Sequence, residues 1–264
     1  MKYKLSDICT FTDERIAVTD LDLDNYISTE NMLQNKEGVI RSAGLPTVNQ
    51  IQAYQPGDVL ISNIRPYFKK IWYADRSGGC SNDVLVLRPK ENTYPGFLYY
   101  LLSDNAFFNY ATATAKGTKM PRGDKDAIMK YEVPNLPIGI QIKIADILSA
   151  LDAQISNNKA INNHLEQIAQ AIFKSWFVDN ASNNWKSVKL GTVIQEIRTK
   201  VKNQYLPVLS AVRTGNLVLS EEFFTKQVYS KDIGRYIVVE PNDFAYNPAR
   251  VNIGSIGINT FGFA

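Results

Sequence analysis

The sequence predicts an α+β protein in three parts: a mixed-sheet domain over residues 1–137, a long coiled-coil helix over residues 138–179, and an incomplete second domain over residues 180–264. Short apolar runs separated by proline and glycine turns predict the first part, and a sustained heptad pattern predicts the second. The third part repeats sequence from the first. At roughly 150 residues per domain, 264 residues also agree with more than one folded unit.

The composition is that of an ordinary globular protein, with 45% hydrophobic and 21% charged residues. We find neither a run of about 18 apolar residues nor a signal-peptide pattern, so we expect a cytoplasmic protein without a membrane span. Cys9 and Cys80 are expected to be reduced. With His164 as the single histidine and no Cys-x-x-Cys motif, we expect no metal site, and we interpret His164 as a solvated helix residue.

The first part alternates short apolar runs with turns. The runs that predict strands are residues 58–64, 69–75 and 82–89. Residues 97–113 carry apolar side chains on a helical period and predict one helix. Residues 115–127 are expected to form an exposed polar loop, and the two prolines and the glycine of residues 133–139 close the domain.

Charge is unevenly distributed in this first part, although the net charge of the chain is only +3. Residues 1–53 hold five Lys/Arg and eight Asp/Glu, whereas residues 54–125 hold ten and six. A local basic surface of this kind suits a phosphate backbone. A solvated charged face without a ligand remains an equal alternative on charge alone.

The helix carries a heptad seam in which steps of four and three residues alternate without a slip. The seam is formed by Ile144, Leu148, Leu151, Ile155, Asn158, Asn162, Leu165, Ala169, Ile172 and Trp176. Ile147, Ile161, Ile168 and Phe173 widen this stripe, so we expect burial against more than one neighbour or partly against the chain's own domains. Residues 141–177 would span roughly 55 Å. The two seam asparagines either fix register and partner number or face solvent.

After a short polar linker over residues 179–185, the sequence begins again at an offset of 185 residues. Residues 4–9 then align with 189–194, and residues 56–66 with 241–251. The second alignment matches Pro56 with Pro241, Asp58 with Asp243, and Arg65 with Arg250. Two matches at one offset indicate a duplicated domain whose second copy ends near the equivalent of residue 79.

Several stretches resemble the DNA-specificity subunit of Type I restriction-modification systems. They are "YISTENM" (26–32), "GTKMPRGDKDAIMKYEVPNLPIGIQIKIADILSALDAQI" (117–155), "FKSWFVD" (173–179), "VLSAVRTGNLV" and "PNDFAYNPARVNIGSIGI". The resemblance covers essentially the whole chain. It implies two target-recognition domains held apart by helical spacers on a bipartite DNA site, with the helix setting the distance between half-sites.

The resemblance also implies partners. Modification subunits would bind S-adenosylmethionine and methylate adenine, a motor-nuclease subunit would join for cleavage, and this chain would hold no cofactor and perform no catalysis itself. The helix and the domain flanks would be the docking surfaces for those subunits. Double-stranded DNA would be the ligand.

The sequence departs from the family pattern in two respects. Gly139 and Ile140 precede Gln141 where the family has an acidic residue, which predicts a weaker helix cap. A full-length member also carries a complete second domain and a second long helix that packs antiparallel against the first. We therefore expect either a piece of a longer chain, or a truncated subunit whose helix pairs with that of a second chain and reads an inverted-repeat site.

Two polar groups are the predicted DNA contacts. They are Asn63, Arg65, Lys69 and Lys70, and the loop residues Lys116, Gly117, Thr118, Lys119 and Arg122. Arg pairs with guanine in bidentate fashion and Asn with adenine, whereas Lys more often holds phosphates. Gly117 and Gly123 would allow the loop a close approach to the DNA backbone. Ordinary solvation is the alternative for each basic residue, and Arg250 is the match of Arg65 in the third part.

Enzyme functions are less favoured. The "YNPAR" stretch (246–250) lacks the second proline and the aromatic residue of adenine-methyltransferase motifs, and no glycine-rich cofactor loop accompanies it. A metal-dependent nuclease would have to use Asp58 or Asp243 without a second suitably spaced carboxylate. A coiled-coil interaction scaffold with degenerate domains is the other alternative.

Overall fold

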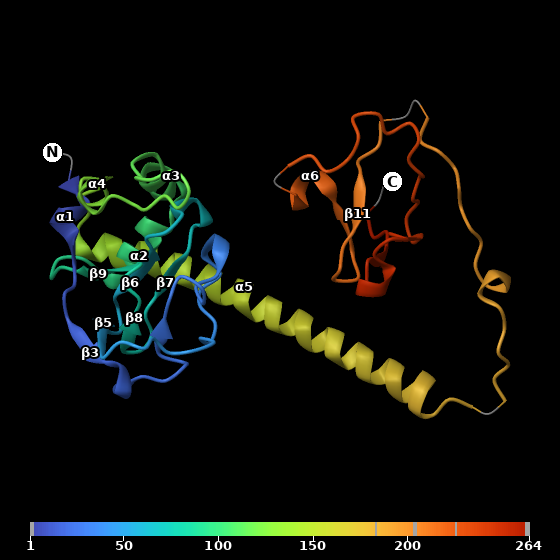
Figure 1. Cartoon of the computed structure of the whole chain (residues 1–264), viewed down its shortest axis with the longest axis horizontal. Helices are drawn as coiled ribbons and strands as arrows, with labels where there is room; N and C mark the ends of the chain where they lie inside the picture. The colour runs from blue at the N-terminus through green and yellow to red at the C-terminus, as the bar shows by residue number, and fades with distance from the viewer. Residues whose placement is uncertain (1–2, 183, 203–204, 225, 262–264) are drawn as a thin grey trace. The chain divides into compact units, whose positions relative to one another are not determined.

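The computed structural model describes residues 3–182, 184–202, 205–224 and 226–261. It divides into two compact units, Met1–Val178 and Asp179–Ala264. The first unit contains two four-stranded sheets and the long helix, and the second contains short hairpins (Figure 1). The predicted α+β class with a mixed sheet and a long helix is confirmed. The predicted domain boundaries at residues 137 and 179 stay a prediction.

Two sheets form the body of the first unit. The first runs in the order β2 (Cys9–Phe11), β9 (Val84–Pro89), β6 (Val59–Ser62) and β7 (Ile71–Tyr73), with all neighbours antiparallel. The second runs in the order β3 (Arg15–Ala17), β5 (Gln50–Tyr54), β8 (Gly78–Cys80) and β4 (Tyr26–Ile27). Because β4 pairs with β8 in parallel and the other pairs are antiparallel, this second sheet is mixed. The predicted strand runs at 58–64, 69–75 and 82–89 correspond to β6, β7 and β9.

Strand β6 is apolar at successive positions because both of its faces are buried. Val59 and Ile61 join one core cluster with residues of the helices, whereas Leu60 joins a second cluster with Tyr54 and Cys80 of the other sheet. Strand β9 divides its side chains in the same way. The first sheet is therefore the middle of three layers, with helices on one face and the second sheet on the other.

Four short helices contribute to the helical layer: α1 (Leu5–Ile8), α2 (Pro95–Ser103), α3 (Asn105–Ala113) and α4 (Lys125–Met129). The prediction of one helix over residues 97–113 is wrong, because Asp104 leaves the helical conformation and separates α2 from α3. Its carboxylate Oδ1 accepts a hydrogen bond from the Ala106 amide at 2.9 Å and so caps the second helix. Strands β1 (Tyr3–Lys4) and β10 (Glu132–Val133) pair beside this layer.

Three 3-10 turns complete the unit: η1 (Val18–Asp20), η2 (Gln34–Lys36) and η3 (Pro66–Phe68). Both cysteines are free thiols inside the core. Burial raises the pKa of Cys9 and of Cys80 to about 12. Neither thiol is therefore ionised near neutral pH.

The long helix α5 (Ile138–Phe173) continues into the π-helical turn η4 (Lys174–Asp179) (Figure 1). Its 36 residues rise about 54 Å. The first turns of α5 pack on α2, where Ala145 is buried and Ile144 and Leu148 are half-buried. A side chain at Gly96 of α2 would lie 3.3 Å from Ala145 Cβ, so a glycine permits this close approach.

Gln141 connects the start of α5 to the domain. Its side-chain amide nitrogen donates to the carbonyl oxygens of Asn92 and Leu136 at 3.1 and 2.8 Å, and its amide oxygen accepts from the Tyr94 backbone at 2.9 Å. The helix begins at Ile138, so Gly139 and Ile140 lie inside its first turn rather than before it. The predicted weaker cap is confirmed, because Pro137 at the N-cap makes no side-chain capping hydrogen bond and the first turn holds no acidic residue. The buried Gln141 anchors this turn instead.

Beyond the contact with α2, the apolar seam of α5 is exposed. The large seam and stripe residues that are exposed are Ile147, Leu151, Ile155, Ile161, Leu165, Ile168, Ile172, Phe173 and Trp176. The predicted helix is confirmed, and so is the expectation that part of its stripe packs against its own domain, through Ile144 and Leu148. Pairing of the remaining seam with a second helix stays a prediction.

The second unit contains η5 (Leu190–Thr192), the β11–β12 pair (Leu209–Ala211, Leu217–Leu219), α6 (Ser220–Phe223), and the β13–β14 pair (Phe244–Tyr246, Ile256–Ile258) joined through η6 (Val251–Ile253). The β13–β14 hairpin has the register of β6–β7 at the offset of 185. Val59 opposes Tyr73 in the first, and Phe244 opposes Ile258 in the second. We call residues 55–74 the first repeat and residues 240–259 the second repeat.

The turns that precede the two hairpins also match. Asp58 Oδ2 accepts from the Gln55 amide at 2.9 Å, and Asp243 Oδ2 accepts from the Glu240 amide at 3.0 Å. The residue before each aspartate has a positive φ, 90° at Gly57 and 72° at Asn242. The two aligned segments therefore share one hairpin geometry, and duplication of the whole domain stays a prediction.

Candidate nucleic-acid interface

The two predicted contact groups lie on two loops that hydrogen bonds join. We call residues 63–70, between β6 and β7, the hairpin tip, and residues 115–124 the basic loop. The Arg65 amide donates to the Pro121 carbonyl at 2.8 Å, and the Gly123 amide donates to the Asn63 carbonyl at 3.0 Å. An isolated antiparallel bridge also joins Ile64 to Arg122. Residues that lie 56 to 60 positions apart in the sequence thus form one surface.

The basic loop is closed on itself by a reciprocal pair of hydrogen bonds. The amides of Lys116 and Arg122 each donate to the carbonyl of the other at 2.8 Å. Gly117 has a φ of +94°, which favours glycine, so its role in the fold is a backbone turn. Gly123 is buried, and a Cβ there would lie 2.9 Å from Asn63 Oδ1. Gly117 therefore allows the backbone turn of the loop, and Gly123 allows the loop to approach the hairpin tip closely.

The hairpin tip and the adjacent turn η2 together contain four non-glycine residues with a positive φ. These are Arg65 and Lys69 on either side of η3, and Asn35 and Lys36 in η2. The Lys36 amide donates to the Lys69 carbonyl at 2.9 Å, so the four residues belong to one junction. Such conformations cost free energy and persist where the surrounding structure imposes them, often at binding sites.

The cations of the basic loop differ in their partners. Arg122 donates to Asp83 Oδ1 from Nη2 at 3.0 Å and from Nε at 3.2 Å, and Lys116 Nζ lies 2.5 Å from Asp124 Oδ2. The hydrogen bond with Asp124 raises the pKa of Lys116, and the same contact lowers the pKa of Asp124. These surface pairs contribute little to stability and can exchange for phosphate. Lys119 is exposed and has no such partner among the described residues.

The two lysines of the hairpin tip are half-buried and point back onto the domain. Lys69 Nζ donates to Asn105 Oδ1 at 2.9 Å, and Lys70 Nζ donates to the Thr29 carbonyl at 2.6 Å. Burial lowers the pKa of Lys70. Their predicted contacts with DNA stay predictions, but Lys119, Thr118 and Arg122 are the more accessible members of the set.

Tyr67 is a candidate contact residue that the sequence reasoning missed. It lies at the outer position of η3 and is 46% exposed, while Pro66 is buried and Phe68 is half-buried. The neighbouring Lys36 is half-buried, and its Nζ donates to the Ser103 carbonyl at 3.0 Å. A signal for Tyr67 was its place between Arg65 and two lysines, because aromatic residues within basic stretches are common where proteins bind nucleic acid.

Asp58 does not offer a metal site. It is buried, and its two carboxylate oxygens accept from Arg88 Nε and Nη2, each at 2.8 Å. Asp243 takes part in the equivalent turn of the second repeat. In the described part of the chain no group of three or more His, Cys, Asp or Glu residues is placed to hold a metal ion. The contacts of Asp58 identify it as a structural residue.

Arg250, the match of Arg65, is exposed at the start of η6. Its φ is −135°, in contrast to +51° at Arg65. The second repeat thus conserves the arginine but not its backbone conformation. His164 is exposed on α5.

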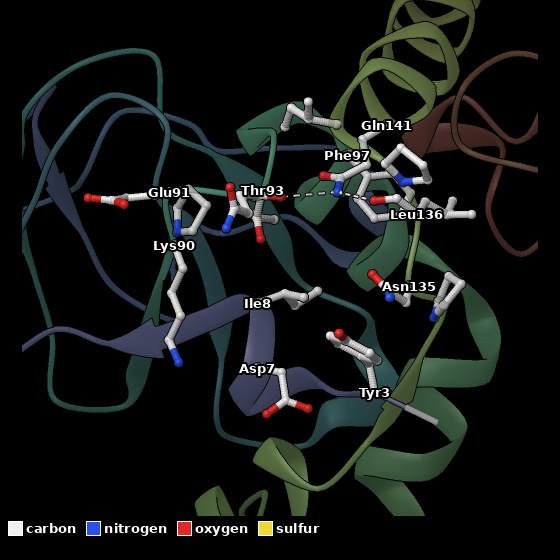
Figure 2. Close-up of a pocket in the computed structure, with 15 residues that line it drawn as sticks. Tyr3, Asp7, Ile8, Lys90, Glu91, Thr93, Phe97, Asn135, Leu136 and Gln141 are labelled. Carbon is white, nitrogen blue, oxygen red and sulfur yellow. Dashed lines mark hydrogen bonds between the residues drawn. The ribbon is translucent and has the colours of Figure 1, made fainter. Parts of the chain in front are cut away.

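A cavity of about 820 Å³ lies where α5 joins the domain (Figure 2). Gln141, Leu136 and Asn135 line it from the helix start, and Tyr3, Asp7 and Lys90 line it from the domain. None of the predicted DNA contacts belongs to its lining. The cavity is therefore a feature of the helix junction and is separate from the two joined loops.

Comparisons with known proteins give a consistent result. A family model described as the Type I restriction modification DNA specificity domain matches residues 1–167. The specificity subunit of the Type I restriction enzyme HindI from Haemophilus influenzae is 33% identical over 189 residues, 67% of this chain and 40% of that protein. The MjaIX specificity subunit from Methanocaldococcus jannaschii is 34% identical over 91 residues, 34% of this chain and 21% of that protein. The chain thus spans less than half the length of these relatives.

Among solved structures, the HsdS subunit from Thermoanaerobacter tengcongensis aligns with a TM-score of 0.49 at 19% sequence identity. The alignment covers 72% of this chain and 51% of that one. Among the described residues, no helix combines the length and the apolar character needed to cross a membrane.

Proposed function

The chain belongs to the Type I restriction modification DNA specificity domain family, and from this premise we propose that it is a sequence-specific DNA-binding specificity subunit. Its first unit recognises one half of a bipartite duplex site. The proposal assigns recognition to the hairpin tip and the basic loop. Methyl transfer and cleavage belong to partner subunits, and the role of this chain is to bring them to the site.

The observation that carries this proposal is the joining of the two loops into one basic surface. Hydrogen bonds of Arg65 with Pro121 and of Gly123 with Asn63 fix the loops to each other, so their side chains are presented in a defined arrangement. Exposed Lys119 and Arg122 supply charge for phosphates, and Arg122 also has the donor geometry that guanine accepts. A prearranged basic surface loses less conformational entropy when it binds a duplex.

The partners in this proposal are modification subunits that bind S-adenosylmethionine and methylate adenine, and a restriction subunit that joins for cleavage. This chain itself holds no cofactor. The exposed length of α5 and the residues around its start provide surface for these subunits. The competing scaffold function uses the same helix but requires no DNA affinity.

The test is selection of bound duplexes from a randomised 40-base-pair library by the full chain, alone and with its modification subunit. We expect enrichment of one bipartite motif. Lys119→Ala should weaken binding to all duplexes and lower the salt dependence by about one released counterion. Lys159→Ala on α5 removes the same charge outside the two joined loops and is the matched control for the experiment with the chain alone, for which we expect wild-type binding.

Binding of the modification subunit without selection of any duplex would favour the scaffold function and overturn the proposal. Cleavage of the duplex by the isolated chain in the presence of magnesium would support the nuclease alternative instead. The two competing functions are thus separated by the same set of reagents.

We propose in addition that the exposed seam of α5 pairs with the same seam of a second chain. The ten seam positions are symmetric about residue 160, because Ile144 and Trp176 lie equally far from it, as do Leu148 and Ile172. An antiparallel pair centred there places Asn158 opposite Asn162 of the second chain, so each polar amide meets another amide. Burial of an exposed apolar stripe supplies the driving force. A symmetric pair would read an inverted-repeat DNA site.

Cysteine cross-linking tests this pairing. In the antiparallel arrangement Ile155→Cys should not cross-link to itself, but should cross-link to Leu165→Cys when the two variants are mixed. A parallel in-register pair gives the reverse result. The buried Cys9 and Cys80, with the pKa of each raised to about 12 by burial, should not compete in the folded protein. A monomeric mass by light scattering at all concentrations would overturn the pairing.

A further inference from the structure

The hairpin tip presents one aromatic side chain to solvent. Within the 3-10 turn η3, Pro66 is buried, Phe68 is half-buried, and Tyr67 is 46% exposed. The Tyr67 ring meets the Phe68 ring edge-on, with 4.8 Å between the ring centroids. The exposed ring therefore rests on a second ring, which limits its rotamers before any ligand arrives.

The backbone beneath Tyr67 is fixed from both sides. Arg65 and Lys69, which flank η3, both have a φ of +51°, and their backbone groups bond to Pro121 and Lys36 respectively. Asn63 Oδ1 and Arg65 Nε are buried without a hydrogen-bond partner in the described structure. Strained dihedrals and unsatisfied polar atoms both cost free energy, and they concentrate where a fold holds a residue for a ligand.

The surroundings of Tyr67 are basic rather than apolar. Arg65 Cζ lies 5.9 Å and Lys70 Nζ 6.0 Å from the centroid of the Phe68 ring on which Tyr67 rests. Met120, which is also 46% exposed, follows Lys119 in the adjoining basic loop. An exposed ring that rests on a second ring with two cations near it fits a base within a phosphate backbone better than it fits an apolar protein surface.

We propose that Tyr67 is a specificity-determining residue that makes an apolar contact with a thymine 5-methyl group in the major groove. Thymine is the base that offers a methyl group in the major groove. Tyr67 lies in the 3-10 turn η3 of the loop that joins β6 to β7, outside the buried strands, and its side chain is exposed for such a contact. This inference rests on the proposed DNA-binding function and names one residue and one base feature within it.

The test uses the full chain with its modification subunit and the duplex selected from the randomised library. We expect Tyr67→Ala to weaken binding to the selected duplex about tenfold, while affinity for a scrambled duplex and the salt dependence stay unchanged. Tyr67→Phe keeps the ring and should bind within about twofold of wild type. Tyr205→Ala removes a 93% exposed tyrosine of the second unit and is the matched control.

Replacing each thymine of the selected duplex by deoxyuridine removes its methyl group one position at a time. At one position we expect the replacement to weaken wild-type binding several-fold and to leave the Tyr67→Ala variant unaffected, because the variant has already lost that contact. Equal responses of wild type and Tyr67→Ala at every position would overturn the inference while leaving DNA recognition intact. Failure of the wild-type chain to select any duplex would overturn the proposed function together with the inference.

Discussion

The two repeats share a hairpin and a turn but not the side chains around them. The first repeat buries Val59, Ile61 and Ile71 against the helical layer. The equivalents of the first two in the second repeat, Phe244 and Tyr246, are 71% and 58% exposed. The strand register is the same in both repeats although the burial of the side chains differs. The aspartate turn and the backbone pairing therefore determine the register of this hairpin, whereas the layer that covers it varies.

The tips of the two hairpins differ as well. Tyr67 and Lys69 of the first repeat correspond to Asn252 and Gly254 of the second, at the offset of 185. Lys69 and Gly254 both have a positive φ, so only the second repeat uses the residue type that tolerates this conformation without strain. The first repeat thus has a lysine in a strained conformation and an exposed tyrosine at its tip. The second repeat forms the same hairpin without either residue type.

The largest expected difference between the repeats concerns Trp72 and its equivalent Gly257. Trp72→Ala leaves a cavity in the cluster between the two sheets and should lower the free energy of unfolding by about 3–5 kcal/mol. Gly257→Ala should also destabilise the protein, but by overpacking rather than by a cavity, because a Cβ there would lie 2.6 Å from Asn216 C. We expect about 1–3 kcal/mol from this overpacking. Urea unfolding monitored by circular dichroism measures both, and equal tolerance of the two changes would contradict the different packing.

The second largest difference in the free energy of unfolding is expected between variants of the two turn aspartates, Asp58 and Asp243. Asp58→Ala removes both acceptors of Arg88 Nε and Nη2 inside the domain and should cost about 3 kcal/mol. Asp243→Ala removes one hydrogen bond from the Glu240 amide and should cost about 1 kcal/mol. The same unfolding experiment compares them. If the two losses were equal, the shared turn rather than the Arg88 pair would account for the effect at Asp58.

Exchanging the positive-φ residues tests backbone strain. Gly254→Lys should destabilise the second unit by about 1–2 kcal/mol, since a side chain is strained at this φ and its Cβ would lie 3.0 Å from the Arg213 carbonyl oxygen. Lys69→Gly relieves strain but loses the contact with Asn105, so a change below about 1 kcal/mol is expected. Amide hydrogen exchange in each hairpin resolves the two effects, and a larger loss at Lys69 would show that its contacts outweigh the strain.

The smallest expected effect belongs to the tip residues themselves. Tyr67→Asn and Asn252→Tyr interchange the side chains of two exposed positions, and each should change the free energy of unfolding by less than about 0.5 kcal/mol. Thermal unfolding measures both variants. A large loss of unfolding free energy in Tyr67→Asn would indicate that this ring stabilises the fold. The weaker DNA binding of Tyr67 variants would then have to be corrected for the fraction of unfolded protein.

Several features of the fold followed from the sequence because they depend on local periodicity. The apolar strand runs at 58–64, 69–75 and 82–89, the continuous heptads of α5 and the offset of 185 residues were all visible without coordinates. The break at Asp104 was not predicted, because the apolar period continues across it and only the capping geometry ends the helix. The role of Gln141 was also missed, since its three partners lie in backbone segments that the fold brings together.

The candidate site was predictable in part. The basic and polar residues of the sequence predicted one contact loop and one group at strand edges. The structure places that second group in the loop between β6 and β7, and hydrogen bonds join it to the basic loop. Which side chains are accessible could not be read from the sequence, because Lys69 and Lys70 bond to Asn105 and Thr29, residues distant along the chain. The exposure of Tyr67 depends on positive-φ residues that are not glycines, which sequence patterns do not reveal.

The anchoring of Gln141 has a mechanical consequence for the spacing role that we propose for α5. The buried amide and its three hydrogen bonds help to hold the start of α5, and the helix extends about 48 Å beyond Gln141 to Phe173. A tilt of about 5° at this start would displace the far end by about 4 Å, which exceeds the roughly 3.4 Å rise of one base-pair step. Gln141 and the packing of Ala145 on α2 together hold the angle of α5, and the spacing of half-sites that we propose for this helix would depend on that angle.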